Sequence, residues 1–270
     1  RAKSIYKKSS ETSGIGILSS TEQQTECGTP IIQEVYRNWN LLSNETKLEM
    51  NELFLTKPNL PLRYQTTHFS INYTLAGPDA STLAYVQSLG NYLENSWSRM
   101  VNDFGFNVPV DNFIDVFVYN MNAMGVTYYD CLFGGPITMD IRNNMSDNDL
   151  KIAASHEFFH AIQSSYEFCE VSWINEGTAM WITDAVYDDI NKYVNYFGWP
   201  VFGAKFYFLD DTNRDITKLS YEAVLFWKYF SEKYGTDGSG RKCFSACNDA
   251  DCGTDVMKRL MENVRSYKNN

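Results

Sequence analysis

Two of the chain's three histidines lie four positions apart, with a glutamate next to the first. The residues are His156, Glu157 and His160, which read H-E-x-x-H. On a helix, positions four apart share a face, so both imidazoles can reach a single metal ion. A carboxylate beside the first imidazole can take a proton from water held at the metal, which makes a nucleophile at neutral pH. The spacing therefore predicts a metal centre that activates water. The alternative is a helix with two incidental histidines.

A third ligand is expected from a carboxylate in an apolar stretch further along the chain. Glu176 lies sixteen positions after His160, within the run from Trp173 to Trp181. A carboxylate buried in such a run needs a partner, and a metal ion is a suitable one. Catalytic zinc usually has three protein ligands and a water, whereas structural zinc has four protein ligands. We therefore expect His156, His160 and Glu176 to bind one zinc ion per chain. The alternative for Glu176 is a helix N-terminal residue stabilised by the helix dipole.

The two motifs together resemble those of the gluzincin-type zinc metallopeptidases, in which the H-E-x-x-H helix is followed by a helix that carries a glutamate ligand. Residues 156–163 and 173–181 carry this resemblance. More loosely, residues 65–235 resemble a group of uncharacterised secreted bacterial metalloproteases. The resemblance implies a zincin-like fold and a secreted, zinc-dependent peptidase in which Glu157 is the base.

The resemblance also implies an oxyanion donor and a substrate-binding strand. Gluzincins commonly supply the donor as a Tyr or His from a later helix, and no histidine follows His160, so a tyrosine is expected. Of the tyrosines, Tyr221 best matches the resembling family, and the alternative for Tyr221 is core packing. In this family an edge strand before the metal helix pairs with the peptide. In this chain that strand would contribute Gly135, Ile137, Thr138 and Met139. Aminopeptidases of the clan carry a glutamate there, whereas this chain has only Asp140, which favours an endopeptidase.

Three other polar positions each allow two interpretations. Asp184 lies eight positions after Glu176 and on the same helix face, so it could accept the second N–H of a ligand histidine or could simply be solvated at the helix end. His68 begins a strand far from the motif, and we expect a structural or exposed role. Residues 211–215 with Glu222 match the outline of a calcium loop. However, Ile216 replaces the glycine that such a loop requires, which favours a polar turn over calcium.

Apolar periodicity and cap residues predict the elements that position these side chains. Strands are expected at 69–75, 113–119, 124–129 and 136–141. Helices are expected at 31–55, at 80–104, at 150–166 with N-cap candidates at 146–149, after Ser172 as a possible N-cap, and at 220–234. A sheet followed by helices is an α+β pattern. We expect an arm and a helical segment at 1–62, either a pro-segment remnant or a buttress. A zincin-like domain follows at 63–270. Its small mixed or antiparallel sheet (about 63–145) lies over the H-E-x-x-H helix, and a mainly helical lobe (about 146–270) completes it.

Composition excludes some classes of partner. The chain has 270 residues, of which 44% are hydrophobic and 15% aromatic, enough for a sizeable core. A formal net charge of −10 argues against nucleic acid, because phosphate binding needs clustered Lys and Arg. No apolar run reaches the length needed to cross a bilayer. We expect a monomer that binds peptide or protein substrates.

The cysteines point to an oxidising compartment. Six of them with scattered spacing predict three disulfides, and Cys131 with Cys169 is the favoured pair. The alternative is a reduced cytosolic protein with buried thiols. The chain begins at Arg1, which suggests a mature product or a piece of a longer precursor.

These features predict a secreted zinc endopeptidase. Two other classes stay open. One is a catalytically silent, zinc-containing extracellular binding protein, although such a protein has no need of the base Glu157. The other is a zinc hydrolase of non-peptide esters or amides.

Overall fold

The sheet is the central layer of the protein. The computed structural model describes residues 25–129, 136–166, 171–197, 213, 215–237, 239–243 and 252–268. The strands are β1 (Thr25–Cys27), β2 (Leu62–Gln65), β3 (Phe69–Tyr73), β4 (Ile114–Tyr119), β5 (Ala123–Tyr128) and β6 (Thr138–Arg142). They form one six-stranded sheet in the order β1-β5-β6-β4-β3-β2. Strands β3, β4 and β6 are parallel, β2 and β5 are antiparallel to their neighbours β3 and β6, and β1 runs parallel to β5. The sheet is therefore mixed.

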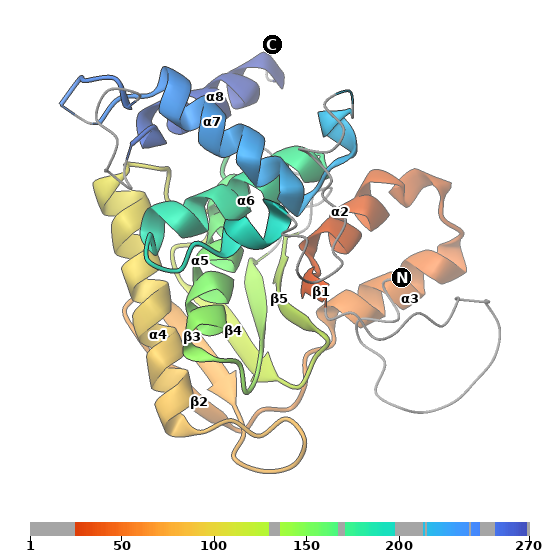
Figure 1. Ribbon diagram of the computed structural model, residues 1–270. Coiled ribbons are helices and arrows are strands. Elements are labelled where there is room, and N and C mark those ends of the chain that lie inside the picture. The colour runs from red at the N-terminus through yellow and green to blue at the C-terminus, as the bar shows by residue number, and fades with distance from the viewer. Residues whose placement is uncertain are drawn as a thin grey trace.

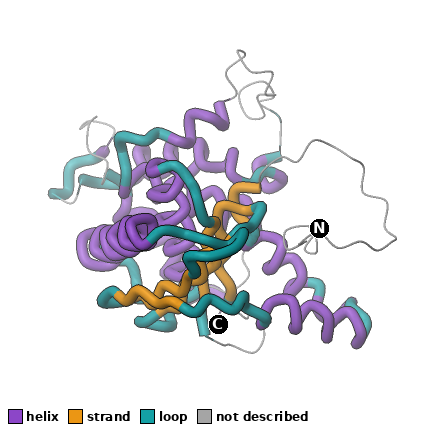
Figure 2. The backbone as a smooth tube through the Cα atoms, turned by 90° about the horizontal axis from the view of Figure 1, so that it is seen from below, coloured by secondary structure: helices purple, strands orange, loops and turns teal. Residues whose placement is uncertain are grey.

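Helices flank the sheet. They are α2 (Thr29–Arg37), α3 (Asn44–Leu55), α4 (Leu83–Trp97), α5 (Asp147–Gln163), α6 (Ser172–Val186), α7 (Val224–Tyr234) and α8 (Thr254–Lys268). Short 3-10 turns lie at Trp39–Leu41, Lys192–Phe197, Ile216–Lys218 and Tyr221–Ala223, and a π-helical turn at Ser98–Asp103 continues α4. Helix α5 packs on β5 and lies between α4 and α6 (Figure 1). Helices α2 and α3 lie beside β1, the strand at one edge of the sheet. Seen from below, the strands form a twisted layer flanked by helices (Figure 2). The α+β class expected from the sequence is confirmed.

Side-chain caps explain where several helices begin. The hydroxyl of Ser146 accepts a hydrogen bond from the Asp149 N–H at 3.2 Å, and so starts α5 where the sequence predicts it. Thr82 caps α4 in the same way, so that helix begins three residues after the expected start at Ala80. Helix α6 begins one residue differently: its N-cap is Val171, and Ser172 is the first helical residue rather than the cap.

The protein has two separate hydrophobic cores among its described residues. The larger one packs α4, α5, α6 and α7 against the sheet around fully buried side chains such as Phe69, Phe158 and Phe159. The smaller one joins α2 and α3 to β5. Its members are Ile32, Tyr36, Trp39, Met50, Phe54, Met121, Ala123, Val126 and Tyr128. The N-terminal segment is thus attached to the sheet through a core of its own, and it also supplies the strand β1.

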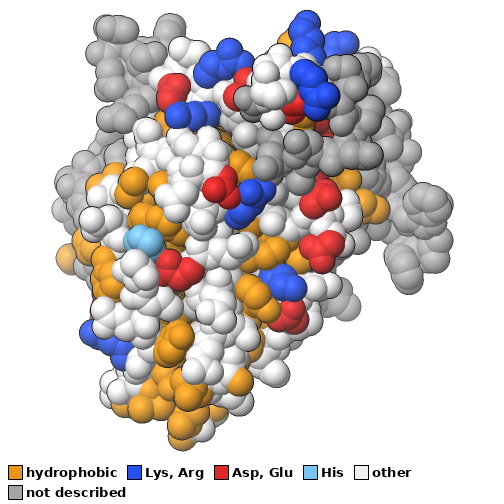
Figure 3. Space-filling view, turned by 90° about the vertical axis from the view of Figure 1, so that its left-hand side faces the viewer, with side chains coloured by type: hydrophobic (Ala, Val, Ile, Leu, Met, Phe, Trp, Pro, Cys, Tyr) orange, Lys and Arg blue, Asp and Glu red, His pale blue; other side chains and the backbone are white. Residues whose placement is uncertain are grey.

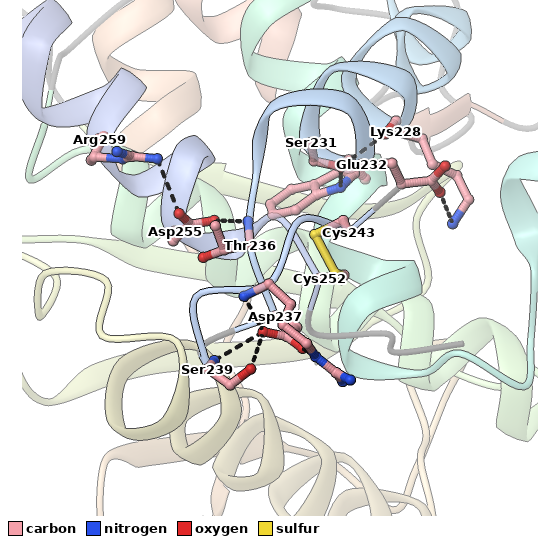
Figure 4. The surroundings of a disulfide bond; sticks show 12 residues. Lys228, Ser231, Glu232, Thr236, Asp237, Ser239, Cys243, Cys252, Asp255 and Arg259 are labelled. Carbon is pink, nitrogen blue, oxygen red and sulfur yellow. Dashed lines mark hydrogen bonds and ion pairs between the residues drawn. A yellow bond between two sulfur atoms is a disulfide. The ribbon is translucent and has the colours of Figure 1, made fainter. Parts of the chain in front are cut away.

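One disulfide ties the C-terminal helix to the end of α7. Cys243 and Cys252 are bonded, and the side chains of Asp237 and Asp255 organise the connection around them (Figure 4). Cys27 is instead a buried free thiol. The prediction that all six cysteines form three disulfides is therefore wrong. The favoured pair Cys131–Cys169 lies outside the described residues.

The distribution of surface charge and the length of the helices are relevant to the expected partners. On the α4 side, acidic and basic side chains are interspersed rather than gathered by sign (Figure 3). Among the described residues, none of the helices is both long enough and apolar enough to cross a bilayer.

Candidate metal centre

Helix α5 holds the H-E-x-x-H residues inside the protein. His156, Glu157 and His160 are 4%, 1% and 0% exposed. The two imidazole rings lie edge to face with their centroids 4.7 Å apart, as expected for residues one helical turn apart on one face. Their Nε2 atoms are 3.1 Å apart. The predicted pairing of the two histidines is present.

Helix α6 brings Glu176 to the same point. Its Oε2 lies 3.2 Å from Nε2 of His156, and its Oε1 lies 3.2 Å from Nε2 of His160. The neighbouring Gly177 allows α7 to pack closely on α6, because a Cβ at that position would lie 2.7 Å from Cδ1 of Trp227 on α7. The carboxylate is fully buried. The structure therefore brings together the three ligands expected from the sequence.

A fourth side chain, which no sequence motif indicates, lies beside them. The sulfur of Cys27, at the end of β1, lies 3.6 Å from Nε2 of His160. The ligand atoms of Cys27, His156, His160 and Glu176 all lie within 4.8 Å of one another. No spacing motif links Cys27 to residues 129 or more positions away, so only the pairing of β1 with β5 reveals it.

The hydrogen bonds around the cluster fit a metal ion. Nδ1 of His160 bonds Oε1 of Gln163 at 2.6 Å, and the Gln163 amide nitrogen donates to Asn175 and Thr178, which fixes the orientation of the amide. Nδ1 of His160 therefore carries a proton, and Nε2 points into the cluster. Oε1 of Glu176 and Nδ1 of His156 are buried and make no hydrogen bond to a described residue.

The separations between the donor atoms also fit. Nitrogen and oxygen ligands about 2.0–2.1 Å from a tetrahedral ion such as zinc lie about 3.3 Å apart, and a sulfur ligand at about 2.3 Å lies about 3.5 Å from each nitrogen. The observed N–N and N–O separations are 3.1–3.2 Å, and the observed S–N separation is 3.6 Å. This buried cluster could hold a metal ion.

Electrostatics within the cluster keep one ligand anionic. Burial disfavours charge on both His160 and Glu176, but the attraction between them prevails. It raises the pKa of His160 to about 9 and, with help from His156, lowers the pKa of Glu176 to about 2. Burial and the carboxylates of Glu157 and Glu176 raise the pKa of the Cys27 thiol, whereas a bound cation would favour the thiolate. Metal binding at this cluster therefore displaces protons.

Glu157 is held apart from the ligands. Its Oε2 accepts a hydrogen bond from the Thr127 hydroxyl at 2.7 Å, and the Thr29 hydroxyl lies 3.3 Å away. Strand β5 passes close to this side chain at Gly125, where a Cβ would lie 2.4 Å from Cγ of Glu157. Glycine is therefore required at this point of close approach. The carboxylate has a fixed position next to the cluster without being part of it.

Tyr221 also lies at the cluster. Its ring centroid is 6.1 Å from that of His156. Its hydroxyl accepts a hydrogen bond from the Cys27 N–H at 2.9 Å and donates to the Cys27 carbonyl at 3.2 Å. Tyr221 thus lies beside the cluster, and in this structure its hydroxyl contacts the N-terminal segment.

Asp184 does not support the histidines. Its Oδ2 accepts from Nζ of Lys228 at 2.5 Å, and its Oδ1 makes no hydrogen bond to a described residue. Eight residues advance about 12 Å along a helix, so sharing a face with Glu176 does not bring Asp184 within reach of the same imidazoles. The orienting role falls to Gln163, three positions after His160, which helical spacing could have identified.

The strand expected to bind substrate is not at an edge. Strand β6 lies between β5 and β4, where Thr138 pairs with Tyr128 and Asp115. Ile137 and Met139 are buried in the main core, and Gly135 lies outside the described residues. The prediction is wrong because the strand that precedes α5 in sequence is not the outer one in space. Strand β5, which lies between β1 and β6, is the strand that passes close to Glu157.

The remaining polar positions are structural. His68 stacks on Trp97 with centroids 3.8 Å apart and bonds Glu94 through Nδ1 at 2.7 Å. This confirms its structural role. The carboxylate of Asp215 caps the turn Ile216–Lys218 by accepting the Thr217 N–H, as in a polar turn. Residues 211, 212 and 214 of the calcium-loop outline lie outside the described residues.

The chain was also compared with known proteins. No protein-family model, curated protein or solved structure matches it. What the protein does is therefore inferred from the residues of this cluster and their surroundings.

Proposed function

We propose that the protein is a zinc-dependent metallopeptidase with a zincin-like catalytic domain of the gluzincin type. The observation that carries this proposal is the convergence of His156, His160 and Glu176, from two successive helices, beside a fixed Glu157. Zinc suits this donor set, because it accepts imidazole, carboxylate and thiolate ligands at tetrahedral separations. One ion per chain is expected.

The catalytic role of Glu157 follows from its position. Zinc bound at the cluster would polarise a carbonyl and lower the pKa of a water molecule. Glu157 then accepts the proton of the attacking water and returns it to the leaving amine. Thr127 holds one carboxylate oxygen from the sheet side, which limits rotation of the group. Glu157 is thus aligned as a base and is not consumed as a ligand.

The surroundings favour internal peptide bonds as the substrate. Strand β5 pairs with β1 on one side and with β6 on the other, so an extended peptide can pair with β5 only in place of β1. Asp140, the one acidic residue of the expected substrate strand, is unsuited to hold a free amine. It is 1% exposed, and its two oxygens accept from Lys57 at 2.9 Å and from Tyr119 at 2.7 Å. An endopeptidase is therefore preferred over an aminopeptidase.

The alternatives are a silent zinc-containing binding protein and a hydrolase of esters or non-peptide amides. The ordered Glu157 supports catalysis, because a binding protein has no use for it. The disulfide between Cys243 and Cys252 supports a proposal that the protein works outside the cytosol.

The test combines metal analysis with one substitution. Protein purified without chelator should contain about one zinc per chain, and Glu157→Gln should retain that zinc. Because the Cys27 sulfur lies in the cluster, hydrolysis of casein, peptides and esters is measured on Cys27→Ser protein as well as on the wild type. Glu157→Gln in the Cys27→Ser background should lower peptide hydrolysis by about 10²- to 10⁴-fold. Absence of zinc, or full activity of the Gln variant, would refute the proposal.

A further inference from the structure

We propose that Cys27 is a fourth metal ligand and that the segment from Thr25 to Arg37 blocks the substrate site, so that this chain is a latent form opened by displacing the segment. This inference rests on the proposed function. It concerns how the same site is regulated, and it assigns a role to the one free thiol among the described cysteines.

The sulfur is placed as a ligand. It lies 3.6 Å from Nε2 of His160 and within 4.8 Å of the donor atoms of His156 and Glu176. It also accepts the N–H of Thr29 at 3.3 Å, a contact that favours a negatively charged sulfur. Three protein ligands leave one position for water in a catalytic site. A thiolate at that position excludes the water that Glu157 would activate.

The backbone of Cys27 is placed where a substrate backbone would be. Strand β1 pairs with β5, with Cys27 opposite Gly125 and the Gly28 N–H bonded to the Gly125 carbonyl at 2.9 Å. The hydroxyl of Tyr221, the expected oxyanion donor, bonds the carbonyl of Cys27. The segment therefore uses both the strand and the donor that a peptide substrate would need.

The next residue of the segment reaches the base. The Thr29 hydroxyl lies 3.3 Å from Oε2 of Glu157 and accepts the Thr127 N–H at 2.8 Å. With the segment in place, Glu157 is 1% exposed and His160 is fully buried. The cavity lined by Met124, His156 and Glu157 measures only about 10 Å³, about the size of one water, so a peptide has no room to approach.

The attachment of the segment allows it to be displaced. Its hydrophobic contacts belong to the smaller core, and the larger core contains no residue of α2 or α3. Near the cluster, Gln33 donates to Tyr129 at 2.6 Å and accepts from Asn175 at 3.0 Å. Lifting the segment breaks these contacts and leaves the packing of α5 on α6 intact. Upon opening, the sulfur gives up the metal and takes a proton from solvent, which reverses the proton release that accompanies its coordination.

X-ray absorption on zinc-loaded, full-length protein tests the ligand directly. Wild type should show one sulfur neighbour at about 2.3 Å, and Cys27→Ser should bind zinc without it, because a serine hydroxyl is not a usual zinc ligand. A wild-type spectrum with only nitrogen and oxygen neighbours would overturn the inference and leave the proposed function standing. Protein that binds no zinc would instead refute the proposed function.

Activity tests the latency. Cys27→Ser should hydrolyse peptides on the order of tenfold faster than the wild type, because the rate of a latent enzyme is reduced by its fraction of open molecules. The control is Glu34→Gln, an exposed residue of α2, which should match the wild type. Equal rates for Cys27→Ser and wild type would overturn the blocking role. If Cys27→Ser misfolds, alkylation of Cys27 in the wild type by iodoacetamide, followed by peptide mass spectrometry, replaces it: activity should rise in proportion to labelling, and labelling without activation overturns the inference.

Discussion

The two sides of the metal cluster are built differently. On one side, α5 and α6 carry His156, His160 and Glu176 inside the large core, where Phe158 packs on Trp97 and Phe69. On the other side, Cys27 arrives on a three-residue strand whose segment is held by the smaller core and a few polar contacts. Both sides bring donor atoms to the same point, but they differ in how much packing fixes them.

This difference bears on the proposed latency, because the candidate ligands differ in how firmly the protein holds them. His156 and Glu176 lie on helices that pack in the main core, so moving either residue out of the cluster requires disruption of that core. Removing Cys27 requires the loss of one smaller core and the hydrogen bonds of β1. Local opening draws on the least stable parts of a protein, and segments with few buried contacts open first. Helices α5 and α6 are thus fixed by the main core, whereas the segment that carries Cys27 depends on the smaller core.

Matched substitutions in the two cores give the largest expected effect. Phe158→Ala removes a fully buried ring from the main core and should lower the free energy of unfolding by about 3–5 kcal/mol. Phe54→Ala removes a 5% exposed ring from the smaller core, where it contacts Tyr36 and Tyr128. We expect it to weaken docking of the segment and to leave the main unfolding transition nearly unchanged. Chemical denaturation and the alkylation rate of Cys27 measure the two effects.

The outcome decides whether the cores are independent. In Phe54→Ala, Cys27 should react faster while the midpoint of the main transition stays near the wild-type value. In Phe158→Ala, the main transition should shift. If both variants lower the same transition by similar amounts, the two cores unfold together and the N-terminal segment is a fixed part of the domain.

Tyr221 connects the two sides, and its removal should have opposite effects on them. In the Cys27→Ser background, Tyr221→Phe should lower peptide turnover by on the order of 10²-fold, the usual cost of losing one oxyanion donor. In the wild type it also removes both hydrogen bonds to the Cys27 peptide, so Cys27 should react faster with iodoacetamide. Tyr229→Phe, at an exposed position on α7, is the matched control. Normal turnover in Tyr221→Phe would mean that another group stabilises the oxyanion.

The sequence predicted the members of the cluster on α5 and α6 and missed Cys27. The two histidines, Glu157 and Glu176 are specified by spacings within one helix or between two successive helices, which periodicity reveals. Of the two interpretations of Asp184, the contact with a histidine of the cluster is wrong, because a shared helix face gives direction and not distance. Cys27 meets Gly125 and Tyr221 through contacts that span 98 and 194 positions, and no local pattern encodes such pairings. Strand order is equally non-local. No local pattern shows that β6, the strand that precedes α5 in sequence, lies inside the sheet between β5 and β4.

The smallest expected effect concerns Glu94 on α4, the helix that packs against α5. Burial by itself would raise the pKa of Glu94, but hydrogen bonds from Thr66 and from the ring and backbone of His68 lower it below its ordinary value of about 4.3. A carboxylate with a lowered pKa in the folded state adds stability that is fully present above its unfolded pKa and is lost as pH falls through the folded pKa.

Replacing Glu94 therefore tests whether acid stability and docking of the N-terminal segment are separate. Glu94→Gln should be less stable than the wild type above about pH 5, and the difference should shrink as the pH falls below about 4, where the wild type loses this contribution. Glu94 on α4 bonds His68, which precedes β3, and three strands separate β3 from β1 in the sheet. The alkylation rate of Cys27 should therefore not change. Glu52→Gln, at an exposed position on α3, serves as the control for both measurements. A stability difference that does not depend on pH would show that Glu94 acts through packing and not through its charge. A faster reaction of Cys27 in Glu94→Gln would show that α4 and the N-terminal segment are coupled across the sheet.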